Sequence, residues 1–217
     1  MGHTRGQVIA IANTTGGVGK STLAGNLTRA LAAQTNQRVL LVDADPQASV
    51  TTWFDLATDD LPFDRTQLTT ARVLPQQLPR LRQQYDLIIV DCPPMQRDVT
   101  AAVTQADLGL VPVLPSPLDV LAYSELVPLL RQAQGMKPRL ALRFVMNQLA
   151  PRTALAREVR ETLTDADIPV LPTYIHDRHM YHRVVAQGAT VVGEPGPAGG
   201  EILALMKDVL DALNPAA

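Results

Sequence analysis

A chain of 217 residues, 46% of them hydrophobic and 18% charged, is long enough to bury one sizeable core, and we expect a single domain over 1–217. This composition excludes a largely disordered chain, and a formal net charge of −2 excludes a uniformly basic nucleic-acid coat protein. The single cysteine, Cys92, excludes an internal disulfide and fits a reducing cytoplasm, while no apolar run approaches the roughly 18 residues that span a bilayer.

Short apolar runs alternate along the chain with longer helical stretches. The pattern predicts strands at 7–12, 38–42, 86–90, 108–113, 140–146 and 168–171. It predicts helices at 20–33, 74–84, 118–134, 154–163, 178–187 and 201–213. Runs such as 87–90 (LIIV) are apolar at every position, which is typical of parallel strands covered by helices on both faces. The predicted fold class is therefore α/β, a doubly wound and mostly parallel sheet.

A glycine-rich loop follows the first predicted strand and opens the first predicted helix. Residues 13–22 read NTTGGVGKST, which misses the strict G-x-x-x-x-G-K-[ST] pattern because no glycine fills its first position. Glycines let successive backbone N–H groups face one anion, and the helix N-terminus adds a positive field. We expect a nucleoside triphosphate to bind here; a plain glycine-rich turn with an exposed lysine is the alternative. The expected contacts are Gly16, Gly17, Val18, Gly19, Lys20, Ser21 and Thr22.

Carboxylates follow two further predicted strands. Asp43 and Asp45 come just before Pro46, and Asp91 follows the run 87–90. Ligands of open α/β sheets bind at the carboxyl ends of strands, and Mg²⁺ prefers oxygen ligands. We expect Asp91 to serve Mg²⁺ and one of the earlier pair to turn toward the phosphates; a solvated acidic strand end is the alternative. Cys92, with no convincing partner base, is expected to be buried as a small hydrophobe.

These segments, in this order, resemble the ParA/MinD group of deviant Walker ATPases, most closely on the ParA side. The likeness rests on NTTGGVGKST at 13–22, VDADPQ at 42–47 and IVDCPP at 89–94. It continues through VPVLPSPLD at 111–119 to Asp177, Arg178 and AQGATV at 186–191. The resemblance thus covers nearly the whole chain.

The resemblance implies roles for single residues. Lys20 would contact phosphate, Ser21 and Asp91 would serve Mg²⁺ with support from Asp43, and Asp45 would orient the attacking water. Asn147, after the predicted strand 140–146, matches a position that often contacts adenine. A structural asparagine at a strand end is the alternative for Asn147.

The resemblance also implies a partition or cargo-positioning ATPase. In that group ATP drives a sandwich homodimer, the dimer binds DNA without sequence preference, and an adaptor protein stimulates hydrolysis. The expected location is cytoplasmic and nucleoid-associated, with no membrane partner. Two alternatives remain: a metabolic P-loop enzyme that transfers phosphate or activates a carboxylate, and a nucleotide switch with little hydrolysis. One cysteine per chain excludes a cluster bridging a dimer, which needs two from each subunit.

One position departs from the family. Its signature lysine precedes the Gly-Gly pair and crosses the dimer interface, whereas this chain has Thr15 there. We therefore expect slow hydrolysis and a weakened or altered dimer. The chain has three lysines, Lys20, Lys137 and Lys207, so Lys137 is the sole lysine candidate outside the loop and the last helix to replace it.

Local charge suggests a DNA-facing segment. Residues 131–183 carry nine Lys/Arg against five Asp/Glu, and phosphate binding needs cations rather than sequence reading. The candidates are Arg152, Arg157, Arg160, Arg178 and Arg183, with solvated helix faces as the alternative. His176, His179 and His182 recur every third residue, so on a helix they would drift apart and we expect no metal site there. The last predicted helix carries one lysine against three acids, which favours packing on the sheet over an anionic membrane.

Overall fold

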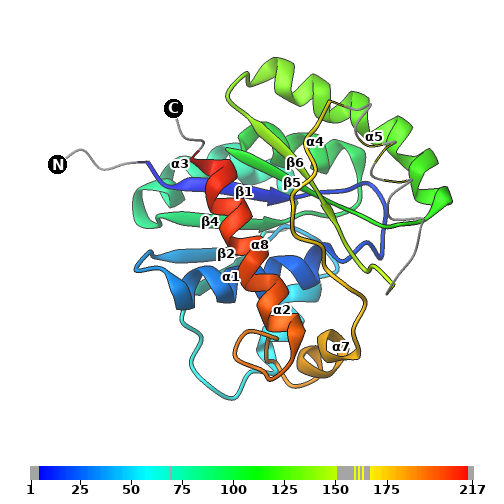
Figure 1. Ribbon diagram of the computed structural model, residues 1–217. Coiled ribbons are helices and arrows are strands. Elements are labelled where there is room, and N and C mark those ends of the chain that lie inside the picture. Colours follow the sequence, from blue (N-terminus) through cyan, green and yellow to red (C-terminus); the bar gives the residue numbers. More distant parts are fainter. Residues whose placement is uncertain are drawn as a thin grey trace.

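The computed structural model describes residues 5–68, 70–150, 159, 161, 163 and 167–214, except for the side chains of 117–122. One parallel sheet lies at its centre, in the order β3-β2-β4-β1-β5-β6 (Figure 1). The strands are β1 (Gln7–Ile11), β2 (Val39–Asp43), β3 (Asp64–Gln67), β4 (Leu87–Asp91), β5 (Leu108–Val113) and β6 (Ala141–Met146). The predicted doubly wound α/β fold is confirmed.

Helices cover both faces of the sheet (Figure 1). One layer contains α1 (Lys20–Gln34), α2 (Ser49–Asp55), α7 (His179–Val185) and α8 (Pro197–Leu213). The other contains the short 3-10 helix η1 (Ala71–Val73), α3 (Leu74–Gln84), α4 (Gln96–Gln105) and α5 (Pro117–Met136). Among the described residues, no helix combines the length and apolar character that crossing a bilayer requires.

The central strands are buried on both faces, as their continuous apolar runs predict. In β1, Val8 and Ala10 pack with the α3–α5 layer, whereas Ile9 and Ile11 pack with the α1 and α8 layer. Successive side chains of a strand point to opposite faces, so a strand between two helical layers has no polar side. Helix α8 places Ile202 and other apolar residues in the second of these layers and packs on α1, which confirms the expected packing of this helix.

Some predicted elements differ from the structure. The edge strand β3 (DRTQ) was not predicted, because its side chains are largely exposed and no apolar run marks it. The segment 168–171 forms only a single parallel bridge, between Val170 and Phe144, since prolines at 169 and 172 cannot donate to a ladder. Helices α2 and α4 were also not predicted. Most of the predicted helix 154–163 lies outside the described residues.

Candidate nucleotide-binding site

The topology brings the glycine-rich loop and the three acidic residues to one edge of the sheet. Strand β4 lies between β1 and β2, so the carboxyl ends of these three strands are neighbours. In the register, Asp91 lies beside Ile11 of β1 on one side and beside Asp43 of β2 on the other. Residues far apart in sequence therefore surround the start of α1, as expected for ligand sites at the carboxyl ends of parallel strands.

The glycine-rich loop is held by its own backbone geometry and by one buried side chain. Gly17 and Gly19 have φ of 75° and 87°, a left-handed conformation that glycine adopts without steric cost. Asn13 is fully buried; its Nδ2 donates to the Pro112 carbonyl at 2.7 Å and its Oδ1 accepts from the Thr15 N–H at 2.8 Å. The first loop residue thus ties the loop to β5 before the chain enters α1.

Asn147 fastens the loop from the end of β6. Its Nδ2 donates to the Val18 carbonyl at 2.7 Å, and the residue is 3% exposed. A Cβ on Gly19 would lie 2.3 Å from that Nδ2, so the contact requires glycine at position 19. The structure therefore gives Asn147 a structural contact, and the adenine contact stays a prediction. Gln148, which the sequence analysis did not single out, adds a hydrogen bond from Nε2 to the Gly17 carbonyl at 2.9 Å.

Asp91 is the most strongly perturbed acid at this edge. It is 1% exposed, and neither carboxylate oxygen has a hydrogen-bond partner within the described residues. Burial raises the pKa of Asp91 to about 7 and nearby Asp43 adds to the rise, although Ser21 and Lys20 lie close enough to oppose it. Two buried, unpartnered carboxylate oxygens next to Ser21 are an oxygen donor set of the kind that a hydrated Mg²⁺ requires.

Lys20 supplies the positive charge of the site. Its Nζ donates to the Thr15 carbonyl at 2.7 Å, so the ammonium lies inside the curl of the loop. Burial lowers the pKa of Lys20, while the carboxylate of Asp91 and the nearby Cys92 and Asp45 oppose this effect. The structure places Lys20 among the groups that the sequence assigned to phosphate and Mg²⁺.

The pair Asp43 and Asp45 separates into two different environments. Asp43 is buried, and its carboxylate accepts from the Thr51 hydroxyl at 2.7 Å and from the Thr51 N–H at 2.9 Å. Strand β2 ends at Asp43, so Asp45 lies in the loop, half-buried, where its Oδ1 accepts from the Gln47 N–H at 2.9 Å. The Asp43 carboxylate is thus hydrogen-bonded to the start of α2, whereas the Asp45 carboxylate accepts only from the turn that follows it among the described contacts.

Cys92 is fully buried, as expected, and burial raises the pKa of its thiol.

A cavity of about 340 Å³ opens beside the start of α1. Gly19, Thr22, Asn147 and Gln148 line it on one side, and residues of the segment 175–185 line the other. Its charged wall is organised by Glu201 of α8, which accepts from His176 Nδ1 at 2.9 Å and forms a forked ion pair with Arg178. No local sequence pattern indicates this wall, because its members come from segments up to 25 residues apart.

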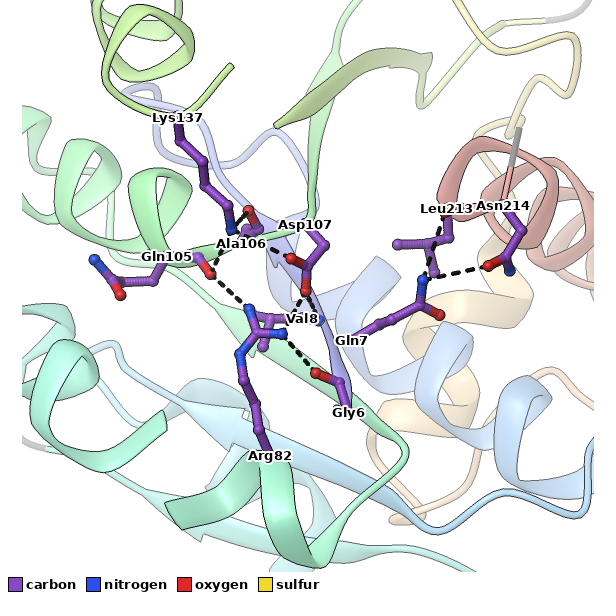
Figure 2. Close-up of polar contacts among 10 residues, drawn as sticks. All are labelled: Gly6, Gln7, Val8, Arg82, Gln105, Ala106, Asp107, Lys137, Leu213 and Asn214. Atoms are coloured by element: carbon purple, nitrogen blue, oxygen red, sulfur yellow. Dashed lines mark hydrogen bonds and ion pairs between the residues drawn. The ribbon is translucent and has the colours of Figure 1, made fainter. Parts of the chain in front are cut away.

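The remaining predicted residues are basic side chains, of which Arg178 lines the cavity just described. Arg178 is paired with Glu201, Arg183 is paired with Glu194 at 3.3 Å, and Arg152, Arg157 and Arg160 lie outside the described residues. Lys137, the candidate to replace the missing lysine, does not lie at the loop of its own chain. Its ammonium contacts Asp107 (Figure 2), immediately before β5, at the amino end of the strands and so at the opposite edge of the sheet from the glycine-rich loop.

A parallel sheet whose first strand leads through a glycine-rich loop into a helix, with a lysine and a buried aspartate beside it, defines a P-loop nucleotide-binding protein. The chain belongs to the CobQ/CobB/MinD/ParA nucleotide-binding family, whose model matches residues 9–191. It is 33% identical to the maintenance of carboxysome distribution protein A of Halothiobacillus neapolitanus, over 97% of this chain and 99% of that protein. It is 36% identical to the protein of the same name from Gloeobacter kilaueensis, over 96% and 94%.

Solved structures share the fold. Apo McdA of Cyanothece superposes with a TM-score of 0.78 at 17% identity, covering 96% of this chain and 99% of that one. Cobyrinic acid a,c-diamide synthase of Mycobacterium smegmatis, bound to an ATP analogue and magnesium, gives a TM-score of 0.78 at 22% identity, over 97% and 96%. Identities this low establish the common architecture alone.

Proposed function

We propose that this chain is a cargo-positioning ATPase of the ParA type. It binds ATP with Mg²⁺, forms a sandwich homodimer, binds nucleoid DNA without sequence preference, and is released when an adaptor protein stimulates hydrolysis. The proposed cargo is a protein microcompartment. This choice is supported by the two carboxysome-distribution relatives, which align over nearly their whole length, whereas the chromosome-partitioning protein ParA of Caulobacter vibrioides is 30% identical over 70% of this chain.

The single observation that carries the nucleotide assignment is Asp91. Two buried carboxylate oxygens without a hydrogen-bond partner are costly, and a buried carboxylate beside a P-loop is stabilised by a divalent cation. Ser21 and Asp91 would hold the Mg²⁺, which supplies charge neutralisation of the phosphates when bound. The backbone N–H groups of 16–20 and the Lys20 ammonium would bind the phosphates themselves.

Asp45 is proposed to hold the attacking water. It is half-buried at the same edge, and no described contact commits its side chain beyond the turn that ends at Gln47. Asp43 would act indirectly, because its bonds to Thr51 fix the loop that carries Asp45. An orienting carboxylate contributes about 10²- to 10⁴-fold in rate.

The test measures ATP binding, dimer mass and hydrolysis in parallel. Lys20→Ala should abolish binding of labelled ATP in the presence of Mg²⁺. Asp45→Ala should keep ATP affinity and the ATP-dependent dimer but slow hydrolysis by about 10² or more.

Matched controls remove the same charges elsewhere. Lys207→Ala and Asp59→Ala change exposed residues outside the site and should behave like the parent. Unchanged ATP binding by Lys20→Ala would refute the site. Turnover of a small carboxylate or phosphate acceptor without any ATP-dependent dimer would favour the metabolic enzyme instead.

A further inference from the structure

The motif AQGATV at 186–191 carries part of the family resemblance, yet none of its residues belongs to the nucleotide-binding site described above. In Figure 1 it is the connection that leaves α7 toward α8. Gly188 has a φ of 66°, and a Cβ there would lie 2.2 Å from the backbone nitrogen of Ala57, just after α2. The motif therefore packs against the C-terminal end of α2 with no room for a side chain at position 188.

One side of this segment is bonded to α2 by the single tryptophan of the chain. The Trp53 indole N–H donates to the Ala189 carbonyl at 2.9 Å, and the residue is 3% exposed. Its ring stacks on Phe54 at a centroid distance of 4.7 Å. A Cβ on Gly25 of α1 would lie 2.4 Å from the same indole ring. Trp53 thus holds α2 between α1 and the segment 186–191.

The other side of the segment is bonded to α1, close to the start of that helix. The Val191 N–H donates to Asn26 Oδ1 at 2.9 Å, and Asn26 Nδ2 donates to the Thr22 carbonyl at 2.8 Å. Asn26 is fully buried, so its bonds do not compete with water. Thr22 directly follows Ser21, the proposed Mg²⁺ ligand. One short segment therefore joins the helix of the phosphate-binding residues to the helix that follows the Asp45 loop.

Helix α2 in turn determines where Asp45 lies. Thr51, in the first turn of the helix, donates its hydroxyl and its N–H to Asp43 Oδ2 at 2.7 and 2.9 Å. The other oxygen of the same carboxylate accepts from the Asp45 N–H at 3.2 Å. The backbone of Asp45 is therefore fixed relative to α2 by one buried carboxylate. Trp53 follows Thr51 by two residues, so the same stretch of helix carries both contacts.

We propose that the segment 188–191 positions the Asp45 carboxylate for hydrolysis, with Trp53 and Thr51 as the positioning residues. The proposal deepens the proposed function and rests on it, because Asp45 must be the group that holds the attacking water. Neither positioning residue has a described hydrogen bond to the glycine-rich loop or to Asp91. Their loss therefore affects the rate of hydrolysis more than the binding of ATP. A displacement of about 1 Å at a reacting group costs as much as about 10²-fold in rate.

The alternative is that these contacts only stabilise the packing of α2. The two roles differ in what they predict for a protein that lacks the Asp45 carboxylate. A positioning contact acts through that carboxylate and has no effect once it is removed, whereas a packing contact costs the same with or without it. A double-mutant cycle on the rate of hydrolysis therefore separates the two roles.

The experiment measures kcat for ATP hydrolysis and the Kd for ATP with Mg²⁺. Trp53→Phe keeps an aromatic ring but removes the indole N–H that bonds to Ala189. We expect kcat to fall about tenfold or more while the Kd for ATP stays within about twofold. In an Asp45→Ala background, the same substitution should change the residual rate by less than about twofold. Phe63→Leu is the matched control, because Phe63 packs on Phe54 at 5.1 Å in the same aromatic cluster. Its kcat should match that of the parent.

Thr51 tests the second contact without removing volume from the core. Thr51→Val removes the hydroxyl that donates to Asp43 and should lower kcat about fivefold or more, with an unchanged Kd for ATP. Thr51→Ser keeps the hydroxyl and should restore the parent rate. This pair decides the question even where Trp53→Phe fails to fold.

Three results would overturn the proposal: a parent-like kcat in Trp53→Phe or in Thr51→Val, an equal fractional loss of rate with and without Asp45, or a loss in Phe63→Leu as large as in Trp53→Phe. Hydrolysis by Asp45→Ala at the parent rate would refute the role of Asp45 in the proposed function, and with it this proposal. Slow hydrolysis by Asp45→Ala beside parent-like rates in Trp53→Phe and Thr51→Val would refute the positioning role alone.

Discussion

The contact between Gly19 and Asn147 shows how one residue controls the shape of the nucleotide loop. Gly19 combines a left-handed φ of 87° with a space in which a Cβ would lie 2.3 Å from the Asn147 amide. Either feature alone disfavours a side chain, and together they fix the residue type. By contrast, a Cβ on Gly16 meets nothing within 4 Å, and its φ is not in the left-handed range. Position 19 therefore requires glycine, whereas neither a close contact nor a left-handed φ requires glycine at position 16.

Gly19→Ala is expected to destabilise the nucleotide-free protein by several kcal/mol, because a left-handed alanine costs about 1–2 kcal/mol and the Asn147 amide must also move. Gly16→Ala, the matched control, should change the free energy of unfolding by less than about 1 kcal/mol. Urea unfolding followed by circular dichroism measures both. Equal losses in the two variants would contradict the role of Asn147 as a fastening for the loop.

Between elements, the cluster of Arg82, Asp107 and Lys137 joins four segments at the amino edge. Arg82 belongs to α3, Asp107 precedes β5, Lys137 follows α5, and the Val8 N–H that bonds to Asp107 belongs to β1. Burial raises the pKa of Asp107, but the hydrogen bonds from Arg82 and Val8 and the charges of Arg82 and Lys137 outweigh it, so the net shift is downward. The cluster stabilises the fold only while Asp107 is ionised.

Asp107→Asn should lower the free energy of unfolding at neutral pH by roughly 2–4 kcal/mol, because Arg82 remains buried without its carboxylate. Asp55→Asn breaks the exposed pair with Arg65 and should cost about 1 kcal/mol or less. A carboxyl with a lowered pKa contributes stability above its unfolded pKa of about 3.9, and this contribution disappears as the pH falls further. The gap between parent and Asp107→Asn in urea unfolding should therefore close below about pH 4, and a gap that stays constant would contradict this assignment.

For the whole molecule, the missing lysine concerns the proposed dimer rather than the fold. Thr15 is half-buried; its N–H bonds to Asn13 and its carbonyl accepts from Lys20, so its backbone serves the loop whatever its side chain. Lys137 lies at the opposite edge and does not supply a cation to the loop of its own chain. The proposed sandwich would therefore lack a lysine from this position.

Thr15→Lys should strengthen the ATP-dependent dimer and raise hydrolysis by about tenfold or more, because a cation across the interface would neutralise phosphate charge. Cations supplied in trans to other P-loop sites are worth about 10³- to 10⁵-fold, and a lysine already engaged before the chemical step would give less. Thr14→Lys adds the same charge one residue away and is the control. Light scattering and phosphate release measure the two effects; unchanged values in Thr15→Lys would mean that another group already provides the cation.

The parallel sheet and the glycine-rich loop could both be predicted from the amino-acid sequence. Strands buried on both faces must be apolar at every position, and a loop that wraps an anion needs glycines followed by a helix, so both features are local and visible. The edge strand β3 was missed for the converse reason, because its exposed side chains carry no apolar period.

Which polar residues contact one another could not be predicted in the same way, because it depends on the tertiary structure. It separated Asp43, bonded to Thr51, from Asp45, although the two are nearly adjacent in sequence. In the folded chain Asn147 also contacts Gly19, and Lys137 lies beside Asp107 at the amino ends of the strands. The order of the strands in the sheet determines which side chains more than a hundred residues apart come into contact, and at which end of the strands they lie. That order cannot be predicted from a local stretch of sequence.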